Sequence, residues 1–299
     1  MSFSEKERIC AKRFIDKAPF WHLYTSGKNT PITLTKEADF RFVMNLLARM
    51  SFQFQTITII AFAIMNNHLH LVIAGDYDEI MCFYDAFRKC FARQFPGSGD
   101  NYKVSAKPIP DLKTLRNTIV YVNRNGYVVD SSYTPYSYTW STGRYYFNDI
   151  RSEHNFGELT YRQKREYFNC REAGIPLDAQ IIDGYVSPMS YCDIKYGMEI
   201  FRDAHQYFYM LGKNLESYAE LAVEIDDDDY LTDTELFSVV LKITKDKYGC
   251  GIRDLKRNQL IEVAKSIHYN YRASNGQIRR MLNLSQYEVD SLFPLSTHS

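Results

Sequence analysis

The chain has 299 residues, of which 15% are aromatic and 24% charged, and its 36 basic residues balance its 36 acidic ones. This composition excludes a disordered protein, and the length allows two or three domains with at least one sizeable core. No stretch approaches the about 20 apolar residues of a membrane span, and the first residues lack the apolar core of a secretion signal.

The six cysteines are scattered and include no Cys-x-x-Cys pair. This pattern favours reduced thiols over a disulfide framework or a zinc ribbon, and it predicts a cytoplasmic protein without a membrane partner.

The neutral total hides a charge pattern along the chain. Residues 1–125 hold 17 Lys and Arg against 11 Asp and Glu, residues 126–150 hold 1 against 2, residues 151–235 hold 8 against 18, and residues 236–299 hold 10 against 5. Two basic segments therefore flank an acidic one. Basic segments suit phosphate backbones, although such charge is also common on ordinary solvated faces.

Hydrophobic periodicity in the first third of the chain predicts an α+β domain built around one antiparallel sheet. β-branched and aromatic runs predict strands, and apolar residues at helical spacing predict helices. The expected strands are 20–26, 54–65, 68–74 and 102–109, and the expected helices are 36–50 and 78–95. The order β-α-β-β-α-β is that of a ferredoxin-like split layout, with Asn66-Asn67 as the turn between two strands.

A further helix is expected after Pro110, with Asp111 as its N-cap. The pair Asn125-Gly126 predicts its end, because both residues accept left-handed backbone angles. Asn117, Tyr121 and Asn125 recur every four residues, so they form one polar stripe on this helix.

The most informative motif is His68-Leu-His70, at the start of the strand after the Asn66-Asn67 turn. Alternate residues of a strand point to the same face, and two neutral imidazoles on one face supply part of a divalent metal site. The ordinary alternative is a pair of half-buried structural histidines. A histidine-triad hydrolase is disfavoured because position 72 is Val, and His22 is interpreted as structural.

Residues 18–148 resemble the single-tyrosine HUH transposases, the insertion-sequence 200-like group and its REP-associated relatives. The resemblance rests on Trp21-His-Leu-Tyr-Thr-Ser-Gly-Lys-Asn29, the His68-Leu-His70 hairpin, Tyr121 with Asn125 one turn later, and Tyr136-Ser-Tyr-Thr-Trp-Ser141. Tyrosines are common in this chain, with 24 in total, so Tyr121 alone would be read as a packing residue.

The resemblance implies a reaction on single-stranded DNA. His68, His70 and Asn125 would hold Mg²⁺ or Mn²⁺, which would polarise the scissile phosphate. Tyr121 would attack the phosphate, form a 5′-phosphotyrosine and release a 3′-hydroxyl, and the covalent bond would allow rejoining without ATP.

The chain departs from the family pattern in three places. Asn66 stands where many members have Pro, Gly126 replaces the Pro of Asn-Pro, and the Gly/Phe-rich hairpin before the tyrosine helix is reduced to 103–110. The first change affects a turn, and the other two affect the segments expected to position the substrate and leave the catalytic set intact.

The second half divides into two expected regions. Residues 149–235 predict a helical spacer or partner-binding region, helical at 158–173 and 193–215 and irregular at 175–190. Residues 236–299 resemble a helix-turn-helix DNA-binding domain. Ser274 and Ser285 stand at capping-box spacings, Asn283 occupies the turn, and 285–293 is the candidate recognition helix. A plain three-helix packing unit is the alternative.

The expected function is therefore that of a metal-dependent transposase and single-stranded DNA endonuclease that recognises hairpins. Candidate DNA contacts are Arg88, Lys89 and Arg93, with Arg279 and Arg280 as candidates for duplex DNA. One alternative is a domesticated relative that binds hairpins without cutting, and another is a metal-dependent hydrolase that uses water. A monomer is expected, since longer relatives with extra domains can be monomers.

Overall fold

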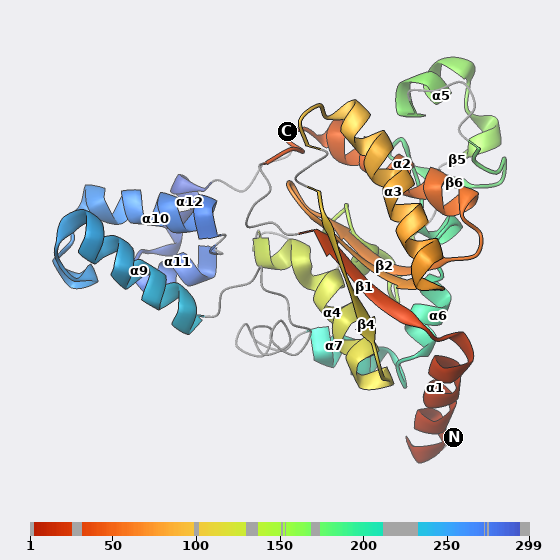
Figure 1. Ribbon diagram of the computed structural model, residues 1–299, viewed down its shortest axis with the longest axis horizontal. Helices are drawn as coiled ribbons and strands as arrows, with labels where there is room; N and C mark the ends of the chain where they lie inside the picture. Colours follow the sequence, from red (N-terminus) through yellow and green to blue (C-terminus); the bar gives the residue numbers. More distant parts are fainter. Residues whose placement is uncertain are drawn as a thin grey trace.

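The computed structural model describes residues 3–25, 32–98, 102–129, 137–150, 152, 154–168, 174–211, 233–271, 273 and 275–293. These residues form a mixed α+β protein with a four-stranded antiparallel sheet, as Figure 1 shows. The predicted α+β class is thus confirmed. Within the described ranges, no helix combines the length and apolar character needed to cross a bilayer.

The sheet has the strand order β2-β3-β1-β4, and every neighbouring pair is antiparallel. Its strands are β1 (Phe20–Thr25), β2 (Thr58–Ile64), β3 (Leu69–Ala74) and β4 (Val104–Ile109). Helix α2 (Glu37–Gln53) connects β1 to β2, and α3 (Tyr77–Gln94) connects β3 to β4. Strands and helices therefore follow one another as predicted. An additional helix, α1 (Phe3–Lys17), precedes them.

The strands are shorter than their hydrophobic runs. β2 begins at Thr58 rather than Phe54 because Phe54 closes α2, donating its backbone N–H to Met50 O over 2.9 Å. His68 lies in the turn immediately before β3, and its carbonyl accepts the N–H of Met65 over 2.8 Å. Both differences concern the first residue of a strand, which the side-chain pattern predicts less well than it predicts the strand itself.

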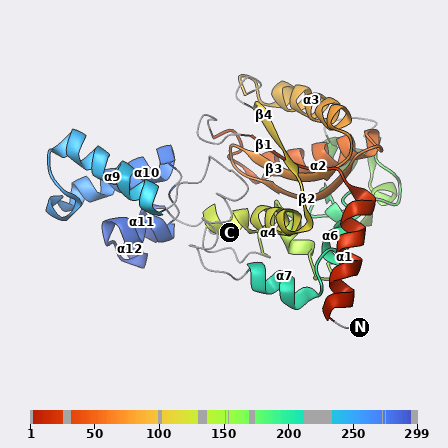
Figure 2. The ribbon, with the colours of Figure 1, turned by 60° about the horizontal axis from the view of Figure 1, so that its bottom comes forward.

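Helix α4 (Leu112–Val129) packs on the face of the sheet opposite α2 and α3 (Figure 2). Asp111 caps it as predicted, since its Oδ1 accepts the N–H of Thr114 over 2.7 Å. The predicted stop at Asn125-Gly126 is wrong, because the helix continues to Val129. Both residues can also adopt right-handed helical angles. Their preference for helix ends is therefore outweighed by the hydrogen bonding and packing of the surrounding helix.

Residues 154–168 and 174–211 pack into the same hydrophobic core as the sheet. They include the short α5 (Tyr161–Phe168), α6 (Ile194–Glu199) and α7 (Ala204–Leu211). The expected irregular stretch instead holds most of a small sheet, formed by β5 (His154–Asn155), β6 (Gln180–Ile182) and β7 (Tyr185–Val186). The expected helix at 193–215 is broken between α6 and α7, so these two predictions were wrong in detail.

One buried amide joins this segment to α2. Asn45 Nδ2 donates to Tyr167 O at 2.9 Å and Gly184 O at 3.1 Å, while its Oδ1 accepts the N–H of Val186 at 2.9 Å. Its side chain thus satisfies backbone groups of β7 and the adjacent turn that would otherwise be buried without partners.

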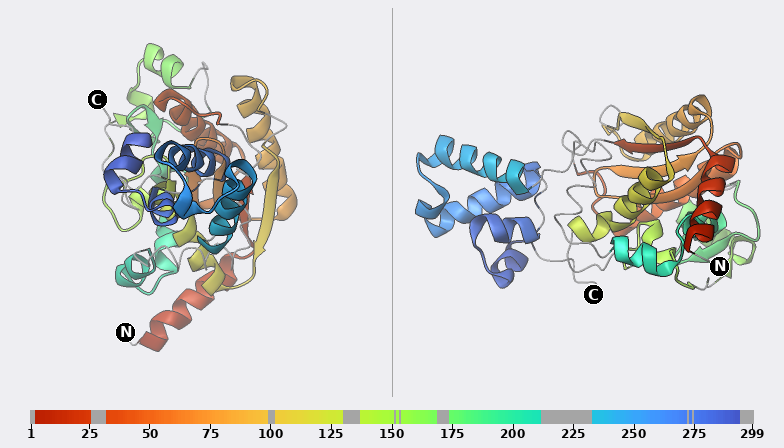
Figure 3. Two further views of the ribbon diagram at one scale, coloured as in Figure 1. Left: turned by 90° about the vertical axis from the view of Figure 1, so that its left-hand side faces the viewer. Right: turned by 90° about the horizontal axis from the view of Figure 1, so that it is seen from below.

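Residues 233–271, 273 and 275–293 contain helices that lie apart from the sheet in Figure 3, and these helices share a second hydrophobic core. The helices are α9 (Asp233–Tyr248), α10 (Arg257–Tyr271), α11 (Asn275–Leu282) and α12 (Gln286–Leu292). Asn283 has the predicted left-handed angle, with φ of 51°. Ser285 and Glu288 form the predicted capping box, whereas Ser274 lies outside the described residues. Helix α9 was not predicted.

Candidate active site

One face of the central sheet carries a row of aromatic and histidine side chains. In the antiparallel register Tyr24 of β1 is opposite His70 of β3, and His22 is opposite Val72. Cross-strand partners share a face, and residues two apart on one strand also share it. His22, Tyr24 and His70 therefore point to the same side, with His70 only 1% exposed.

The turn between β2 and β3 adds His68 to this row. The ring centroids of His68 and His70 lie 5.0 Å apart, and the rings are nearly perpendicular, at 82°. The backbone between the two histidines is fixed by β1, because the Leu69 N–H donates to Thr25 Oγ1 over 3.0 Å. The buried Thr25 hydroxyl thus holds the His68-Leu-His70 segment against the neighbouring strand.

Tyr121 comes to the same place from α4. Its ring lies edge-on to His70, with centroids 5.6 Å apart, and to His22 at 6.2 Å. Tyr121 is 2% exposed. The structure therefore brings together three of the residues that the sequence singled out, from segments about fifty residues apart. His22, His68, His70 and Tyr121 are called the His/Tyr cluster below.

The ring nitrogens of the two candidate ligands have distinct environments. His68 Nδ1 lies 3.0 Å from Asn67 Oδ1, and His70 Nδ1 lies 3.2 Å from His22 Nε2. An amide oxygen accepts only, so His68 carries a proton on Nδ1. In the neutral ring this leaves the lone pair on Nε2. For His68, then, Nε2 is the nitrogen that could ligate a metal ion.

Asn125 lies one turn after Tyr121 and is 6% exposed. Its Nδ2 donates to Tyr121 O over 3.2 Å, so the amide oxygen is the atom that could serve as a ligand. Across the described ranges, no group of three or more His, Cys, Asp or Glu side chains is arranged to hold a metal ion. Any metal site here would consist of two imidazoles and an amide oxygen, with the remaining positions left to substrate and water.

The segment that carries the aromatic signature runs along the outer edge of β2. Trp140 O accepts the N–H of Ile64 over 2.9 Å, and Tyr138 donates its hydroxyl to Ile64 O over 2.7 Å. Ser141 forms a β-bridge with Ala63. These contacts cover an edge that would otherwise expose unpaired backbone groups. The signature residues Tyr138, Trp140 and Ser141 thus have a structural role, while Tyr136 lies outside the described residues.

The same segment fixes α4. The Thr142 hydroxyl accepts the N–H of Phe62 at 2.9 Å and lies 2.7 Å from Asn123 Oδ1, to which it donates. Asn123 Nδ2 donates to the Tyr207 hydroxyl over 3.1 Å. Burial raises the pKa of Tyr207, so this hydroxyl stays protonated. Asn123 is two residues from Tyr121, and the contacts therefore set the position of the candidate nucleophile.

Arg88, Lys89 and Arg93 lie on α3, which is on the opposite face of the sheet from α4 (Figure 2). Lys89 and Arg93 are exposed, whereas Arg88 is half-buried and forms an ion pair with Asp85 at 3.7 Å. The structure does not bring these three residues to the His/Tyr cluster.

Arg279 and Arg280 are exposed on α11. Arg279 donates to Gln286 Oε1 of α12 over 2.7 Å. Glu288 of α12 forms an ion pair with Arg257, and Asp290 accepts from Gln286 at 2.9 Å. Gln286, Glu288 and Asp290 of the expected recognition helix are thus engaged by neighbours within the chain.

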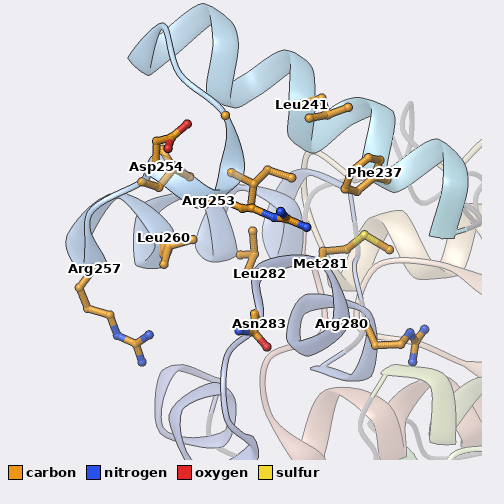
Figure 4. Close-up of a pocket in the computed structure, with 13 residues that line it drawn as sticks. Phe237, Leu241, Arg253, Asp254, Arg257, Leu260, Arg280, Met281, Leu282 and Asn283 are labelled. Atoms are coloured by element: carbon orange, nitrogen blue, oxygen red, sulfur yellow. The ribbon is translucent and has the colours of Figure 1, made fainter.

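Arg280 lines a groove of about 830 Å³ beside α9, shown in Figure 4. Arg253 and Arg257 also line it, and apolar side chains of α9 and α11 form much of the remaining wall. Phe237 and Leu241 are 44% and 42% exposed. Sequence reasoning missed Arg253 and Arg257, because α9 was not predicted and no motif links the two arginines to Arg280.

Sequence reasoning also missed the place of His22 in the cluster. The available signal was its alternation with Tyr24 on a strand expected to enter the same sheet. The strand order was needed to put β1 directly beside β3. No family model, curated protein or solved structure matches the chain.

Proposed function

We propose that the chain is a metal-dependent tyrosine transposase that nicks and rejoins single-stranded DNA. The observation that carries the proposal is the meeting of Tyr121 with His68 and His70 on one face of the sheet. In addition, His68 is held in the tautomer that leaves Nε2 for a metal ion. The reaction requires a nucleophile and ligands for a metal ion, and these side chains are of both kinds.

The strand order and connections support a ferredoxin-like assignment for the sheet domain. β1, α2, β2, β3, α3 and β4 follow one another in the chain, and β1 and β3 lie at the centre of the sheet. A fold alone does not define an activity, so the proposal rests on the side chains placed on its α4 face.

Each residue of the set has a chemical task. His68, His70 and the Asn125 amide oxygen would hold Mg²⁺ or Mn²⁺, which when bound supplies charge stabilisation for the scissile phosphate. The Tyr121 oxygen loses its proton and forms a bond to phosphorus, while the bond from phosphorus to the 3′-oxygen breaks and that oxygen takes up a proton. The 5′-phosphotyrosine retains the phosphodiester energy, so a 3′-hydroxyl can attack it and rejoin the strands.

The proposal is tested with labelled single-stranded DNA hairpins from the two ends of the protein's own gene, incubated with the protein and Mn²⁺. We expect a covalent adduct of one protein mass on a denaturing gel, absent with EDTA and in Tyr121→Phe. Tyr24→Phe is the matched control, because Tyr24 lies in the same row with its ring 6.1 Å from that of His70. It should retain the adduct.

Two results would contradict the transposase mechanism. Cleavage that persists in Tyr121→Phe without an adduct would mean that water is the nucleophile, as in a metal-dependent hydrolase. If the adduct still forms in the double variant His68→Ala with His70→Ala, the two histidines do not act as the metal ligands of the reaction.

A hairpin-binding protein that does not cut is the second candidate, favoured by the burial of Tyr121 and His70 at 2% and 1% exposure. Because Tyr121 is buried, a phosphate can reach its oxygen only if the surrounding groups move. Binding without cleavage requires no such movement. If hairpins bind equally well to wild type and Tyr121→Phe and no adduct forms with any hairpin, the binding role is correct.

A further inference from the structure

His22 lies at a defined position relative to the candidate ligand His70. It is two residues before Tyr24 on β1, and Tyr24 is the register partner of His70. His22 and His70 are therefore diagonal neighbours on the same face, close enough for large side chains to touch. At 2% exposure, His22 is part of the interior rather than of the surface.

The two rings form a direct contact through specific nitrogens. His22 Nε2 and His70 Nδ1 are 3.2 Å apart, and the ring planes are within 13° of parallel, with centroids 5.4 Å apart. A hydrogen bond between two ring nitrogens contains one proton, so one ring donates and the other accepts. The tautomer of one histidine thereby determines that of the other.

Only one of the two arrangements is compatible with metal binding. If His22 donates, neutral His70 must carry its own proton on Nε2 and has no lone pair there. If His70 donates from Nδ1, its Nε2 has the lone pair that a metal ion requires. Asn67 imposes this same tautomer on His68 through the 3.0 Å contact with Nδ1.

We propose that His22 is a positioning residue that accepts a hydrogen bond from Nδ1 of His70 and so leaves the Nε2 lone pair of His70 for a metal ion. The inference rests on the proposed metal site. His22 does not ligate the ion itself, because its Nε2 accepts from His70 and the Nδ1 of the neutral ring then carries the proton. Partners that hold the second nitrogen of a ligating histidine orient the ring and raise its basicity, and their loss costs about 10–100-fold in metal affinity.

The test measures Mn²⁺ binding without DNA, by electron paramagnetic resonance of the unbound ion. His22→Leu removes the acceptor, and we expect the dissociation constant to rise about 10–100-fold. His22→Gln can place an amide oxygen near the position of Nε2, and it should restore most of the affinity. His154→Leu is the control, since His154 is exposed on β5 and paired with Glu158, and it should bind as wild type does.

A second readout follows the tautomer directly. In ¹⁵N-labelled, metal-free wild type, long-range ¹H–¹⁵N correlations should show His70 protonated on Nδ1, with the signals assigned by their loss in His70→Gln. In His22→Leu, Nε2-protonated His70 should appear. This measurement on wild type does not depend on whether the leucine variant folds.

The outcomes separate the two proposals. If wild type does not bind Mn²⁺, or binds it equally after His68→Ala and His70→Ala, the proposed metal site fails. If wild type binds Mn²⁺ through these histidines but His22→Leu binds equally tightly, the role of His22 is overturned. A wild-type spectrum with His70 protonated on Nε2 overturns it as well.

Discussion

The hydroxyl of Thr142 donates to Asn123 Oδ1 over 2.7 Å and thereby ties helix α4 to the edge strand β2. The same hydroxyl accepts the N–H of Phe62, and both side chains are completely buried. Two elements distant in sequence thus share one buried hydroxyl. Since Asn123 is two residues from Tyr121, this contact couples the stability of the fold to the position of the candidate nucleophile.

Replacing Thr142 with Val preserves its shape but removes the hydroxyl. The Phe62 N–H and the Asn123 carbonyl then lose a buried partner, and we expect the free energy of unfolding to fall by about 1–3 kcal/mol. Trp140 belongs to this core and Trp21 packs against it, so urea unfolding followed by tryptophan fluorescence measures the loss.

Thr118→Val is the matched control for this change. Thr118 is buried on the same helix, but its hydroxyl donates to Thr114 O within the helix, over 2.8 Å. Its removal should cost much less, because no contact between elements is lost. Equal losses for the two variants would contradict the role of Thr142 as a tie between α4 and β2.

Asn45 makes an analogous tie between α2 and backbone groups of Tyr167, Gly184 and Val186. Asn45→Leu should lower the free energy of unfolding by about 2–4 kcal/mol, because it leaves the buried Val186 N–H and two carbonyls without their amide partner. Chemical denaturation measures this, with the exposed Asn148→Leu as control. A loss no larger than that of the control would show that these three backbone groups do not depend on Asn45.

The sequence predicted the elements of the sheet domain because their patterns are local. Alternation placed β1 and β3, helical spacing placed α2, α3 and α4, and Asp111 marked the start of α4 correctly. The predicted helix end at Asn125-Gly126 was wrong because the local signal there was weak. A helix stop is a weak local preference, and nothing in the local pattern showed that α4 would continue to Val129.

Only part of the candidate site could be predicted, because local pattern shows which residues share a face but not which elements lie side by side. His68 and His70 share a face through strand alternation, but only strand order places His22 next to His70. The contact of Tyr121 with His70 depends on how α4 crosses the sheet, and local sequence does not fix that crossing. The burial of both side chains likewise depends on segments distant in the chain.

The stability of the C-terminal helices should depend on pH through His268. Burial lowers the pKa of His268 below its ordinary value of about 6.5. Its Nδ1 donates to Ala273 O over 3.2 Å, and its ring stacks on Phe293 with centroids 4.0 Å apart. As pH falls through about 6.5, the unfolded chain takes up a proton that the folded chain does not, so stability is lost toward acid.

Amide hydrogen exchange in α10, corrected for the intrinsic effect of pH, measures this dependence. Protection should decrease from pH 7.5 to 5.5 in wild type and change less in His268→Gln, whose side chain does not titrate. An identical pH dependence in the two proteins would mean that other groups determine it.

If the C-terminal helices bind duplex DNA, Arg279 and Arg280 are the candidate phosphate contacts. If both contact phosphates, Arg279→Ala with Arg280→Ala should weaken binding to all duplex sequences alike. It should also reduce the slope of log affinity against log salt by about 2, since each phosphate contact contributes about 0.9. Fluorescence anisotropy at several salt concentrations measures both quantities.

Lys245→Ala with Lys265→Ala removes the same charge from exposed positions on α9 and α10 and serves as the control. An equal change of slope in the control would show that the helices attract DNA only through their total charge, and a specific loss at α11 would place the phosphate contacts there.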